Sequence, residues 1–536
     1  MEWRHIQAAQ RLLASEQGAI VRDWGGRVPI ALAYPNSYAI GMSSLAMHGL
    51  YRWFNDLPGL VCERTFARLG RQSFRQDPPI TIESQRSISE MAVLALTVSF
   101  EMDYFHVVDM LRRAHIPLNA AERDDSHPIV LVGGPAVSAN PAVLAPLADA
   151  ILIGEVEPGL KALGACLGSA WSLDRVEMLD GLAHIPGMLV PLVNPDARVH
   201  RQRLRNLDDH PLHSSVVAPQ AGFGDMHLIE VSRGCPHGCR FCLAGHWYRP
   251  VREHSYESII EQAKQGAAIG KIGLVGSAVA DHSRIDDIAR ELLSMDVGIS
   301  VSSLRVSPLS PVLVQALAQS GSRTITLAPE AGSERMRQAI SKRVTHDDVL
   351  RATELAGQHR FQTLKLYFMV GLPGEEDQDI ESLIALAGEV HERFPRQTVV
   401  NVTPFVPKAH TPFQRAALAP LEVVSARLER IRAACRERRI EVRAEGAMDS
   451  RIQAILARGD QRVGETLMTM PRPAPRSLLK TLKKQGIDPD EYLRARSPDE
   501  SLPWDQIDCG INPHLLDREA RRAAEALRSS THPEET

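Results

Sequence analysis

The sequence predicts an α/β protein built from two successive βα domains and a mainly helical carboxyl-terminal region. Apolar strand-like runs alternate with helical patterns over residues 28–190, and the same alternation returns over residues 226–408. Beyond residue 420 the patterns are mainly helical. The predicted parts are a doubly wound domain (1–190), a connector (191–222), a partial (β/α)6 barrel (223–415) and a helical region (416–536).

The first domain has four strand candidates, each followed by a turn or a helical pattern. The third and fourth end in glycine-containing turns, Gly133-Gly134 and Gly154-Glu155. Open parallel sheets bind ligands beyond the carboxyl ends of their strands, so these turns mark the edge where a ligand would bind. The strand candidates are residues 28–33, 91–98, 128–132 and 150–153.

The second domain repeats the strand–helix unit six times. In parallel barrels the active site lies at the carboxyl ends of the strands. A loop with three cysteines and several polar or glycine-containing motifs follow the predicted strands, so we expect them to meet at one rim. The strand candidates are residues 228–231, 271–275, 298–303, 324–328, 363–370 and 398–403.

The remaining segments give weaker signals. The connector is rich in Pro, Asn, Asp and His and lacks a long periodic pattern. Five basic residues cluster in the helical region, and we interpret them as a solvated helix face rather than a polyanion site. They are Arg472, Arg476, Lys480, Lys483 and Lys484.

Composition argues against several classes of protein. The formal net charge of −4 offers no global electrostatic case for binding nucleic acid or a membrane. No apolar run approaches the roughly 20 residues of a spanning helix, and the amino terminus lacks the apolar core of a secretory signal. The chain has seven cysteines, three of them clustered, which is not the pattern of a disulfide framework. We therefore expect a cytoplasmic protein with free thiols.

Three cysteines share the loop after the first strand of the second domain. Cys235, Cys239 and Cys242 form a CxxxCxxC motif within eight residues, and the intervening glycine and proline residues prevent a regular helix. Three thiolates from one loop can hold a metal centre and leave one coordination position without a cysteine. Structural zinc requires a fourth ligand, which here would be His237 or His246, both awkwardly placed.

An iron–sulfur cluster is the alternative to zinc. A 4Fe–4S cluster held entirely by protein needs four cysteines, whereas the other four cysteines are isolated in the sequence and are interpreted as ordinary thiols. With three cysteines, one iron stays open to a chelating ligand. The isolated cysteines are Cys62, Cys166, Cys435 and Cys509.

The cysteine motif, with Phe241 before its third cysteine, resembles that of the radical S-adenosylmethionine (SAM) superfamily over residues 223–408. In that family the open iron chelates the amino and carboxylate groups of SAM. Reductive cleavage gives methionine and a 5′-deoxyadenosyl radical that abstracts hydrogen from substrate, while the protein orients the reactants and excludes water. The resemblance implies an enzyme served by a small electron donor of the flavodoxin or ferredoxin type. It identifies no catalytic residue.

The resemblance also places SAM contacts at strand ends. Gly276 and Ser277 stand where the family contacts the SAM amino group, although the usual acidic residue is absent. Glu330 matches the residue that binds the ribose hydroxyls, with a carboxylate at a helix entry as the alternative. Lys342 and Arg343 resemble a basic pair that faces the SAM carboxylate. The full set of expected cofactor-binding residues is Gly276, Ser277, Ser303, Arg305, Glu330, Arg343, Val370, Gly371 and Leu372, of which the last three belong to a motif that packs the adenine.

The first domain is similar to that of the cobalamin-binding-domain radical SAM proteins, through residues 133–137 and 153–157. In those proteins a Rossmann-like domain precedes the barrel and can hold a corrinoid between the two. Many carry Asp-x-His-x-x-Gly, whose histidine coordinates cobalt, but the equivalent loop here, residues 34–42, lacks it. Either cobalamin binds without a protein histidine or the domain has kept the fold and lost the cofactor; we lean towards binding. His48 is interpreted as a packing residue.

An uncharacterised radical SAM subgroup resembles nearly the whole chain. Its motifs recur at residues 327–332, 405–413, 457–460 and 502–508, so the carboxyl-terminal third belongs with the enzyme. The resemblance does not supply the substrate. The candidate substrate-facing residues, each with rim packing as its alternative, are His246, Tyr248, Arg249, Lys408 and His410.

Several functional hypotheses stay open at this point. Within the family, methyl transfer through cobalamin competes with cobalamin-free oxidation, rearrangement or ring formation. A methylthiotransferase would need a second cysteine triplet, and residues 1–222 contain only Cys62 and Cys166. From a different class, a non-catalytic Fe–S or zinc module could bind RNA through the basic cluster, but the net charge argues against it.

Overall fold

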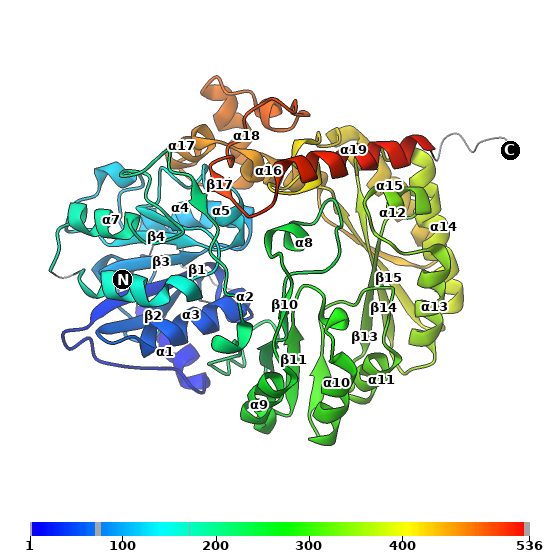
Figure 1. The fold of residues 1–536 in the computed structure, drawn as a ribbon, viewed down its shortest axis with the longest axis horizontal. Helices are drawn as coiled ribbons and strands as arrows, with labels where there is room; N and C mark the ends of the chain where they lie inside the picture. The colour runs from blue at the N-terminus through cyan, green and yellow to red at the C-terminus, as the bar shows by residue number, and fades with distance from the viewer. Residues whose placement is uncertain (1–2, 70–76, 171, 530–536) are drawn as a thin grey trace.

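The computed structural model describes residues 3–69, 77–170 and 172–529. Figure 1 shows two βα units side by side, with the carboxyl-terminal elements lying across one end of both. The first unit is a six-stranded sheet and the second a curved arrangement of parallel strands. The predicted order of the two βα domains is confirmed.

The first sheet has the strand order β2-β1-β3-β4-β5-β6. Strands β1 to β5 are parallel and β6 is antiparallel to β5. Apolar clusters cover both faces, one with α3 (Leu45–Asp56) and α6 (Leu160–Gly168), the other with α4 (Tyr104–Arg113). The doubly wound prediction is therefore confirmed. The strands are β1 (Val28–Ser37), β2 (Leu60–Arg68), β3 (Val93–Thr97), β4 (Ile129–Gly133), β5 (Ala150–Leu152) and β6 (Met188–Leu189).

Sequence reasoning missed β2 because charged residues interrupt its apolar pattern. Arg64 is buried in the middle of β2 and forms ion pairs with Glu83 at 2.7 Å and Glu16 at 2.6 Å. Glu63 is buried on the same strand and accepts hydrogen bonds from Thr81, Ser84 and the Trp24 indole. Buried charges are tolerated where partners satisfy them. These partners come from segments distant in sequence, so no local pattern predicts the strand.

The second unit contains the predicted parallel strands and one more. The strands form two parallel sheets, of order β12-β11-β8 and β13-β14-β15-β16, which meet at a parallel bridge between Leu304 and Leu327. Strand β16 lies beyond residue 415, so the sheet extends past the predicted barrel boundary and takes α15 (Leu421–Glu437) with it. The strands are β8 (His227–Glu230), β11 (Lys271–Val275), β12 (Gly298–Ser300), β13 (Thr324–Glu330), β14 (Thr363–Val370), β15 (Gln397–Pro404) and β16 (Glu441–Ala444).

Helices cover the outer side of these strands, as Figure 1 shows for α13 and α14 beside β13 to β15. The apolar side chains of both sheets and of these helices form one buried cluster. The covering helices are α9 (Tyr256–Gly266), α10 (Ile285–Ser294), α11 (Pro311–Gln319), α13 (His346–Gly357), α14 (Asp377–Arg393) and α15.

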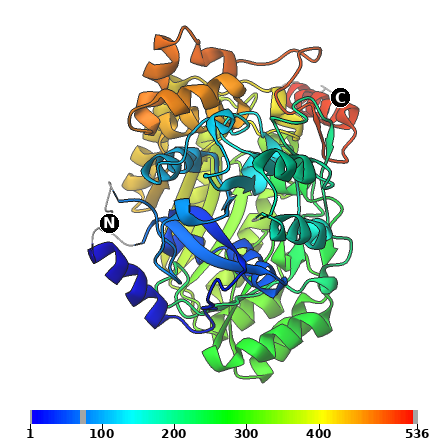
Figure 2. The ribbon, with the colours of Figure 1, turned by 90° about the vertical axis from the view of Figure 1, so that its left-hand side faces the viewer.

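The carboxyl-terminal helices pack on the first domain, above it in Figure 2. Asn140 donates hydrogen bonds to the carbonyls of Ala457 and Gly459, and β17 (Ile507–Asp508) pairs with β7 (Val199–His200). None of the described helices is long and apolar enough to cross a membrane. The elements of this region are α16 (Ala447–Arg458), α17 (Gln461–Thr469), α18 (Pro475–Lys484), β17 and α19 (Pro513–Ser529).

The contact between α17 and the first domain predicts a large effect at Gly464. A Cβ atom there would overlap the backbone carbonyl of Val143, which cannot rotate away. We expect Gly464→Ala to lower the free energy of unfolding by about 3 kcal/mol, the upper range for overpacking. Denaturant unfolding measures this. Gly168→Ala is the matched control, because a Cβ at Gly168 meets open space; equal stability of the two variants would contradict the packing.

Candidate cofactor site

The three-cysteine loop lies at the rim of the second unit. It follows β8 and the short β9 (Ser232–Arg233) and precedes α8 (Leu243–Trp247). Cys239 is buried, and Cys235 and Cys242 are half-buried. Burial raises the pKa of all three thiols, that of Cys242 to about 11, and the three affect one another electrostatically. The predicted cysteines therefore converge in one place.

Both histidines considered as a fourth zinc ligand are engaged elsewhere. His237 Nε2 lies 2.9 Å from Asp281. His246 Nε2 donates a hydrogen bond to the Cys239 carbonyl at 3.2 Å, and burial lowers the pKa of His246 to about 4. Among the described residues, no three His, Cys, Asp or Glu side chains, the three cysteines included, lie close enough together to hold a single metal ion. The arrangement offers three thiols without a fourth ligand, which does not match a closed zinc site.

The remaining cysteines do not join the loop. Cys62 belongs to the apolar core of the first domain, and Cys166 packs against this core. Cys435 lies in the core of the barrel. Cys509 lies in the core that the first domain shares with the carboxyl-terminal helices. All four are free and separate, as predicted.

An ion pair between a buried lysine and a half-buried glutamate lies beside the cysteines. Lys342, which follows α12 (Glu334–Ala339), places its Nζ 3.0 Å from Oε1 of Glu330 at the end of β13. Positive charge from Lys342 and Arg305 opposes the rise in the pKa of the Cys235 and Cys239 thiols that burial causes. The two cations offset part of the cost of burying these thiols, but the pKa values of the thiols stay above the ordinary cysteine value.

Glu330 has a left-handed backbone, with φ of +72°. A residue other than glycine in this conformation costs about 1–3 kcal/mol and persists where the surrounding structure imposes it, often at functional sites. This conformation turns the chain at the end of β13. The turn places the Glu330 carboxylate next to Lys342.

The other residues expected to bind the cofactor are spread along the rim. Arg305 donates to the Ser307 carbonyl, Ser303 is exposed, and Gly276 and Ser277 line a cavity described below. Of the predicted basic pair, Lys342 is buried beside Glu330 whereas Arg343 is exposed. The structure thus brings Lys342, rather than Arg343, next to the cysteines.

The turn after β14 adjoins an apolar cluster near the cysteine loop. Val370 is buried, Gly371 has φ of +80° and donates its N–H to Glu375, and Leu372 packs in the cluster. Phe241 of the cysteine motif and two residues of α19 contact the same cluster. Sequence reasoning missed α19 here, since nothing in its sequence places it near residues 372 or 241. The cluster contains Ala331, Met336, Ile340, Leu372, Phe405, Phe413 and Ala523, with Phe241, Met369, Ala416 and Leu527 against it.

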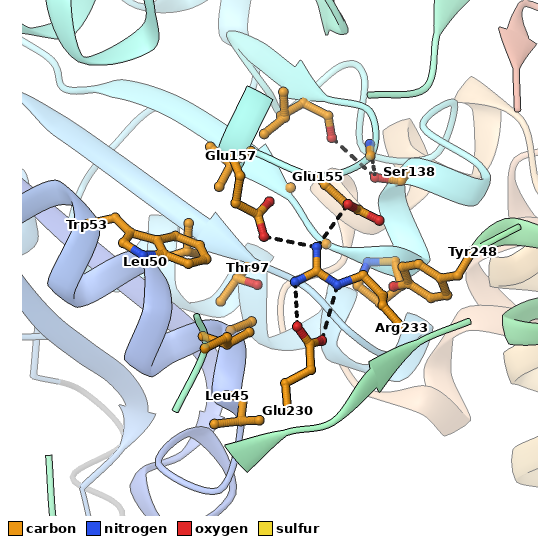
Figure 3. Close-up of a pocket in the computed structure, with 18 of the residues that line it drawn as sticks. Leu45, Leu50, Trp53, Thr97, Ser138, Glu155, Glu157, Glu230, Arg233 and Tyr248 are labelled. Carbon is orange, nitrogen blue, oxygen red and sulfur yellow. Dashed lines mark hydrogen bonds and ion pairs between the residues drawn. The ribbon is translucent and has the colours of Figure 1, made fainter. Parts of the chain in front are cut away.

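A cavity of about 410 Å³ separates the first domain from the barrel rim. Figure 3 shows it with α3 on one side and β8 on another. Its walls are largely apolar and reach between α3 and the first sheet, where Leu32, Ala95 and Leu131 line it. The glycine turns predicted to mark a ligand edge, at residues 133–134 and 154, also line it. The cavity therefore lies where sequence reasoning expected a ligand.

Arg233 joins the two domains at this cavity. Its guanidinium lies 2.9 Å from both Glu155 and Glu157 of the first domain and 2.8 Å from Glu230 of β8 (Figure 3). Arg252 also binds Glu155, at 2.7 Å. Burial acts to raise the pKa of Glu230, but Arg233 and His254 outweigh it and lower that pKa to about 2. Arg233 is thus held by three carboxylates, and it lies two residues before Cys235.

Most of the candidate substrate-facing residues have structural partners. His410 is buried and donates to the Ala139 carbonyl, Lys408 pairs with Glu101 at 2.6 Å, and Arg249 donates to the His237 carbonyl. Together with His246, they fit the packing interpretation. Tyr248 alone of the five lines the cavity. His48 is buried and bonded to backbone atoms, as a packing residue would be.

His410 predicts a dependence of stability on pH. Burial lowers its pKa to about 4, whereas an unfolded histidine titrates near 6.5. The unfolded chain binds more protons between these values, so the His410 contribution is complete above pH 6.5 and is lost as the pH falls towards 4. We expect His410→Gln to reduce the loss of unfolding free energy between pH 7.5 and 5 by about 2 kcal/mol. Denaturant unfolding at both pH values measures this; an unchanged difference would contradict it.

The inner face of β14 to β16 carries polar residues that sequence reasoning did not select. Leu364, Leu366 and Phe368 of β14 are buried, whereas Lys365 and Tyr367 alternate with them, and Tyr367 is 38% exposed. Tyr367 stands in register with Asn401, and Asn401 with Arg443. Parallel sheets are usually covered on both faces, so a polar, partly exposed face is unusual. The alternation within β14 was the signal that could have identified it.

Two family models match the chain. The model described as "Radical SAM proteins, N-terminal" matches residues 46–191, and "Radical SAM superfamily" matches residues 229–387. An uncharacterised protein of Methanocaldococcus jannaschii is 30% identical over 484 residues, which cover 89% of this chain and 98% of that protein. An uncharacterised methyltransferase of Pyrococcus horikoshii is 24% identical over 304 residues, 54% of this chain and 64% of that protein.

The solved structures include the radical SAM methyltransferase TsrM from Kitasatospora setae with cobalamin and a [4Fe-4S] cluster bound. It is 15% identical, with a TM-score of 0.48, and the match covers 70% of this chain and 75% of that one. These values describe a distant likeness. The family of this chain is established by the two family models and the 30% identical relative, and not by this structural likeness.

Proposed function

This chain belongs to the radical SAM superfamily, and we propose that Cys235, Cys239 and Cys242 bind a 4Fe–4S cluster at which SAM is cleaved reductively. The convergence of three thiols on the barrel rim carries the proposal. Two further features support it: the neighbouring histidines are engaged elsewhere, and the Glu330–Lys342 ion pair lies alongside. When bound, the cluster supplies the electron that cleaves SAM and starts radical chemistry.

The cysteine loop fits such a cluster. The donor set is three thiols, which leaves one iron without a protein ligand. Backbone N–H groups of His237 and Gly245 donate to the sulfurs of Cys235 and Cys242 and stabilise their thiolates. Lys342 and Arg305 add positive charge. These groups partly offset the rise that burial causes in the pKa of the thiols, and they would stabilise the thiolates once a cluster is bound.

The ends of β13 and β14 fit a bound SAM. We assign the ribose hydroxyls to the Glu330 carboxylate, the SAM carboxylate to Lys342, and the adenine to the turn at residues 370–372. The sequence predicted Lys342 and Arg343 as a basic pair, with Arg343 in the expected set. Of the two, Lys342 is the buried cation, and its Nζ lies 3.0 Å from Glu330 Oε1. Gly276, Ser277 and Ser303 remain proposed contacts. The apolar cluster around Leu372 excludes water from this part of the rim.

The cavity between the domains supports a corrinoid as a second cofactor. The apolar part of the cavity reaches between α3 and the sheet of the first domain. Thr97, Ser138 and the ion pairs of Arg233 supply polar groups at its edge. A volume of about 410 Å³ lies within the ~300–1,000 Å³ of small-molecule sites and would enclose only part of a corrinoid. A corrinoid in this cavity would find no histidine among the described residues that line it. Methyl transfer and cobalamin-free oxidation both remain candidate reactions.

The proposal is tested by cluster reconstitution. Anaerobic loading with iron and sulfide, reduction with dithionite and addition of SAM should give 5′-deoxyadenosine and methionine, detected by liquid chromatography. A protein that binds four irons but forms neither product would contradict the proposal. This assay needs no knowledge of the substrate.

Corrinoid binding has its own test. Protein purified with hydroxocobalamin should retain it and show its visible spectrum. Ala46→Trp is the matched variant, because Ala46 lines the cavity from α3, and it should lower the amount retained at unchanged cluster content. If the unaltered protein retains no corrinoid, the cobalamin alternative is removed and the cobalamin-free reaction remains.

The other hypotheses receive less support. The basic residues of α18 are exposed on one solvated helix, as expected for a surface face, and no further cysteine triplet was found that could hold a methylthiotransferase's second cluster. Radical SAM enzymes generally need a reductant. We propose a small flavodoxin or ferredoxin type donor for this one, and a cytoplasmic location stays a prediction from its free thiols.

A further inference from the structure

Arg240 lies inside the cysteine motif, between Cys239 and Cys242, and its side chain points away from them. Its Nη1 donates to the carbonyls of Gln338 at 3.2 Å and Ala339 at 2.8 Å, at the end of α12. The last carbonyls of a helix have no partner within the helix and attract a cation. Arg240 therefore caps α12, and it is only 7% exposed.

The backbone of Arg240 is fastened as well. Its N–H donates to the Ile340 carbonyl at 2.9 Å, and its carbonyl accepts from the N–H of Phe413 at 3.3 Å. The turn that follows α12 carries Lys342, and the Cys239 sulfur lies 3.9 Å from the Ser341 carbonyl in this turn. Arg240 thus holds the cysteine loop next to the turn that contains Lys342.

The last partner of Arg240 comes from α19. Glu519 Oε2 lies 3.0 Å from Nη2 and 3.3 Å from Nε of Arg240. The α19 helix is anchored beside this pair, because Ala523 and Leu527 pack in the apolar cluster around Leu372. A Cβ at Gly374 would overlap Leu527, which shows how closely α19 approaches the turn after β14. Figure 1 shows α19 lying across α12 at the rim.

We propose that Arg240 and Glu519 are positioning residues, which hold the cysteine loop in register with Lys342 and so make α19 a part of the cofactor site. The inference rests on the proposed function for its consequence, since the distance between the loop and Lys342 would set the affinity for SAM. The matched family models end at residue 387. They contain neither α19 nor this contact.

The test compares Glu519→Gln with Arg522→Ala. Glutamine keeps the shape of Glu519 but loses the charge that pairs with Arg240. Arg522 binds the other oxygen of Glu519, at 2.7 Å, so its removal perturbs the same carboxylate without touching Arg240. In protein without a cluster, hydrogen exchange of the amides at residues 239–247 should speed up in E519Q and stay unchanged in R522A.

In reconstituted protein, the KM for SAM in 5′-deoxyadenosine formation should rise about tenfold in E519Q, as for loss of one charge-assisted hydrogen bond. The iron content, the melting temperature and kcat should stay the same. Arg240→Lys, which keeps the charge but loses the paired contacts to α12, should raise both KM and exchange.

Each outcome decides the matter. Unchanged hydrogen exchange and an unchanged KM in E519Q overturn the positioning role of the Arg240–Glu519 pair. An equal change in R522A overturns it as well. Loss of cluster from E519Q also overturns the proposal, because the iron content is expected to stay the same. If the unaltered protein forms no 5′-deoxyadenosine, the proposed function fails. Hydrogen exchange in the cluster-free protein still shows whether the Arg240–Glu519 pair holds the cysteine loop.

Discussion

Replacing any one of Cys235, Cys239 and Cys242 with alanine is expected to abolish 5′-deoxyadenosine formation. The remaining two thiolates would leave a second iron of the cluster without a protein ligand, and the loop offers no substitute because His237 and His246 are engaged. We expect the iron and sulfide bound after reconstitution to fall severely and the 5′-deoxyadenosine rate to drop by at least about 1,000-fold, the scale of losing an essential catalytic group.

The matched control is Cys166→Ala. Cys166 is a free, partly exposed thiol of the first domain, so its removal should leave iron content and product formation unchanged. Iron, sulfide and visible absorption measure the cluster, and chromatography measures the product. Full activity in any of the three single variants of the loop would refute the assignment of that cysteine.

Lys342→Met is expected to weaken SAM binding strongly, whereas Arg343→Ala is expected to leave it unchanged. Methionine keeps the buried stem of the side chain but removes the cation next to Glu330. Loss of the proposed charge-assisted contact between Lys342 and the SAM carboxylate costs about 2 kcal/mol, which is about 30-fold in affinity. Isothermal titration of SAM into the reconstituted variants measures this directly.

The pair of variants separates two interpretations of one motif. The sequence allowed either cation to face the SAM carboxylate, and the structure favours Lys342 because it is buried and 3.0 Å from Glu330. The double variant Lys342→Met, Glu330→Gln tests whether the loss comes only from an uncompensated Glu330 charge. Recovery of affinity in the double variant, or a loss confined to Arg343→Ala, would contradict the direct role of Lys342.

Much of the molecule followed from local sequence. The strand–helix alternation predicted both βα units, because a buried parallel strand is a short apolar run and an amphipathic helix has its own period. The spacing of Cys235, Cys239 and Cys242 predicted a shared loop, since three residues within one turn-rich segment cannot lie far apart. Glycines at residues 133–134 and 154 correctly marked the edge where the cavity opens.

Other features required the tertiary structure. The charged strand β2 is stable only because Glu16 and Glu83 reach Arg64 from other segments. His246 and His410 looked available for substrate until their carbonyl partners were known. The packing of α16 to α18 on the first domain joins residues more than 300 positions apart, as between Asn140 and Ala457. Such contacts leave no periodic pattern in either segment.

The sequence by itself determined the two βα units, the three thiols on the rim and the absence of a second cysteine triplet. Only the tertiary structure decided that Lys342 rather than Arg343 meets Glu330, that Arg233 ties the cavity to the cysteine loop, and that α19 reaches Arg240. The physical reason is that local patterns depend on the period of the backbone, whereas an ion pair depends on where two distant segments pack. The partner of a charged side chain therefore cannot be predicted from the local sequence, because it depends on the fold.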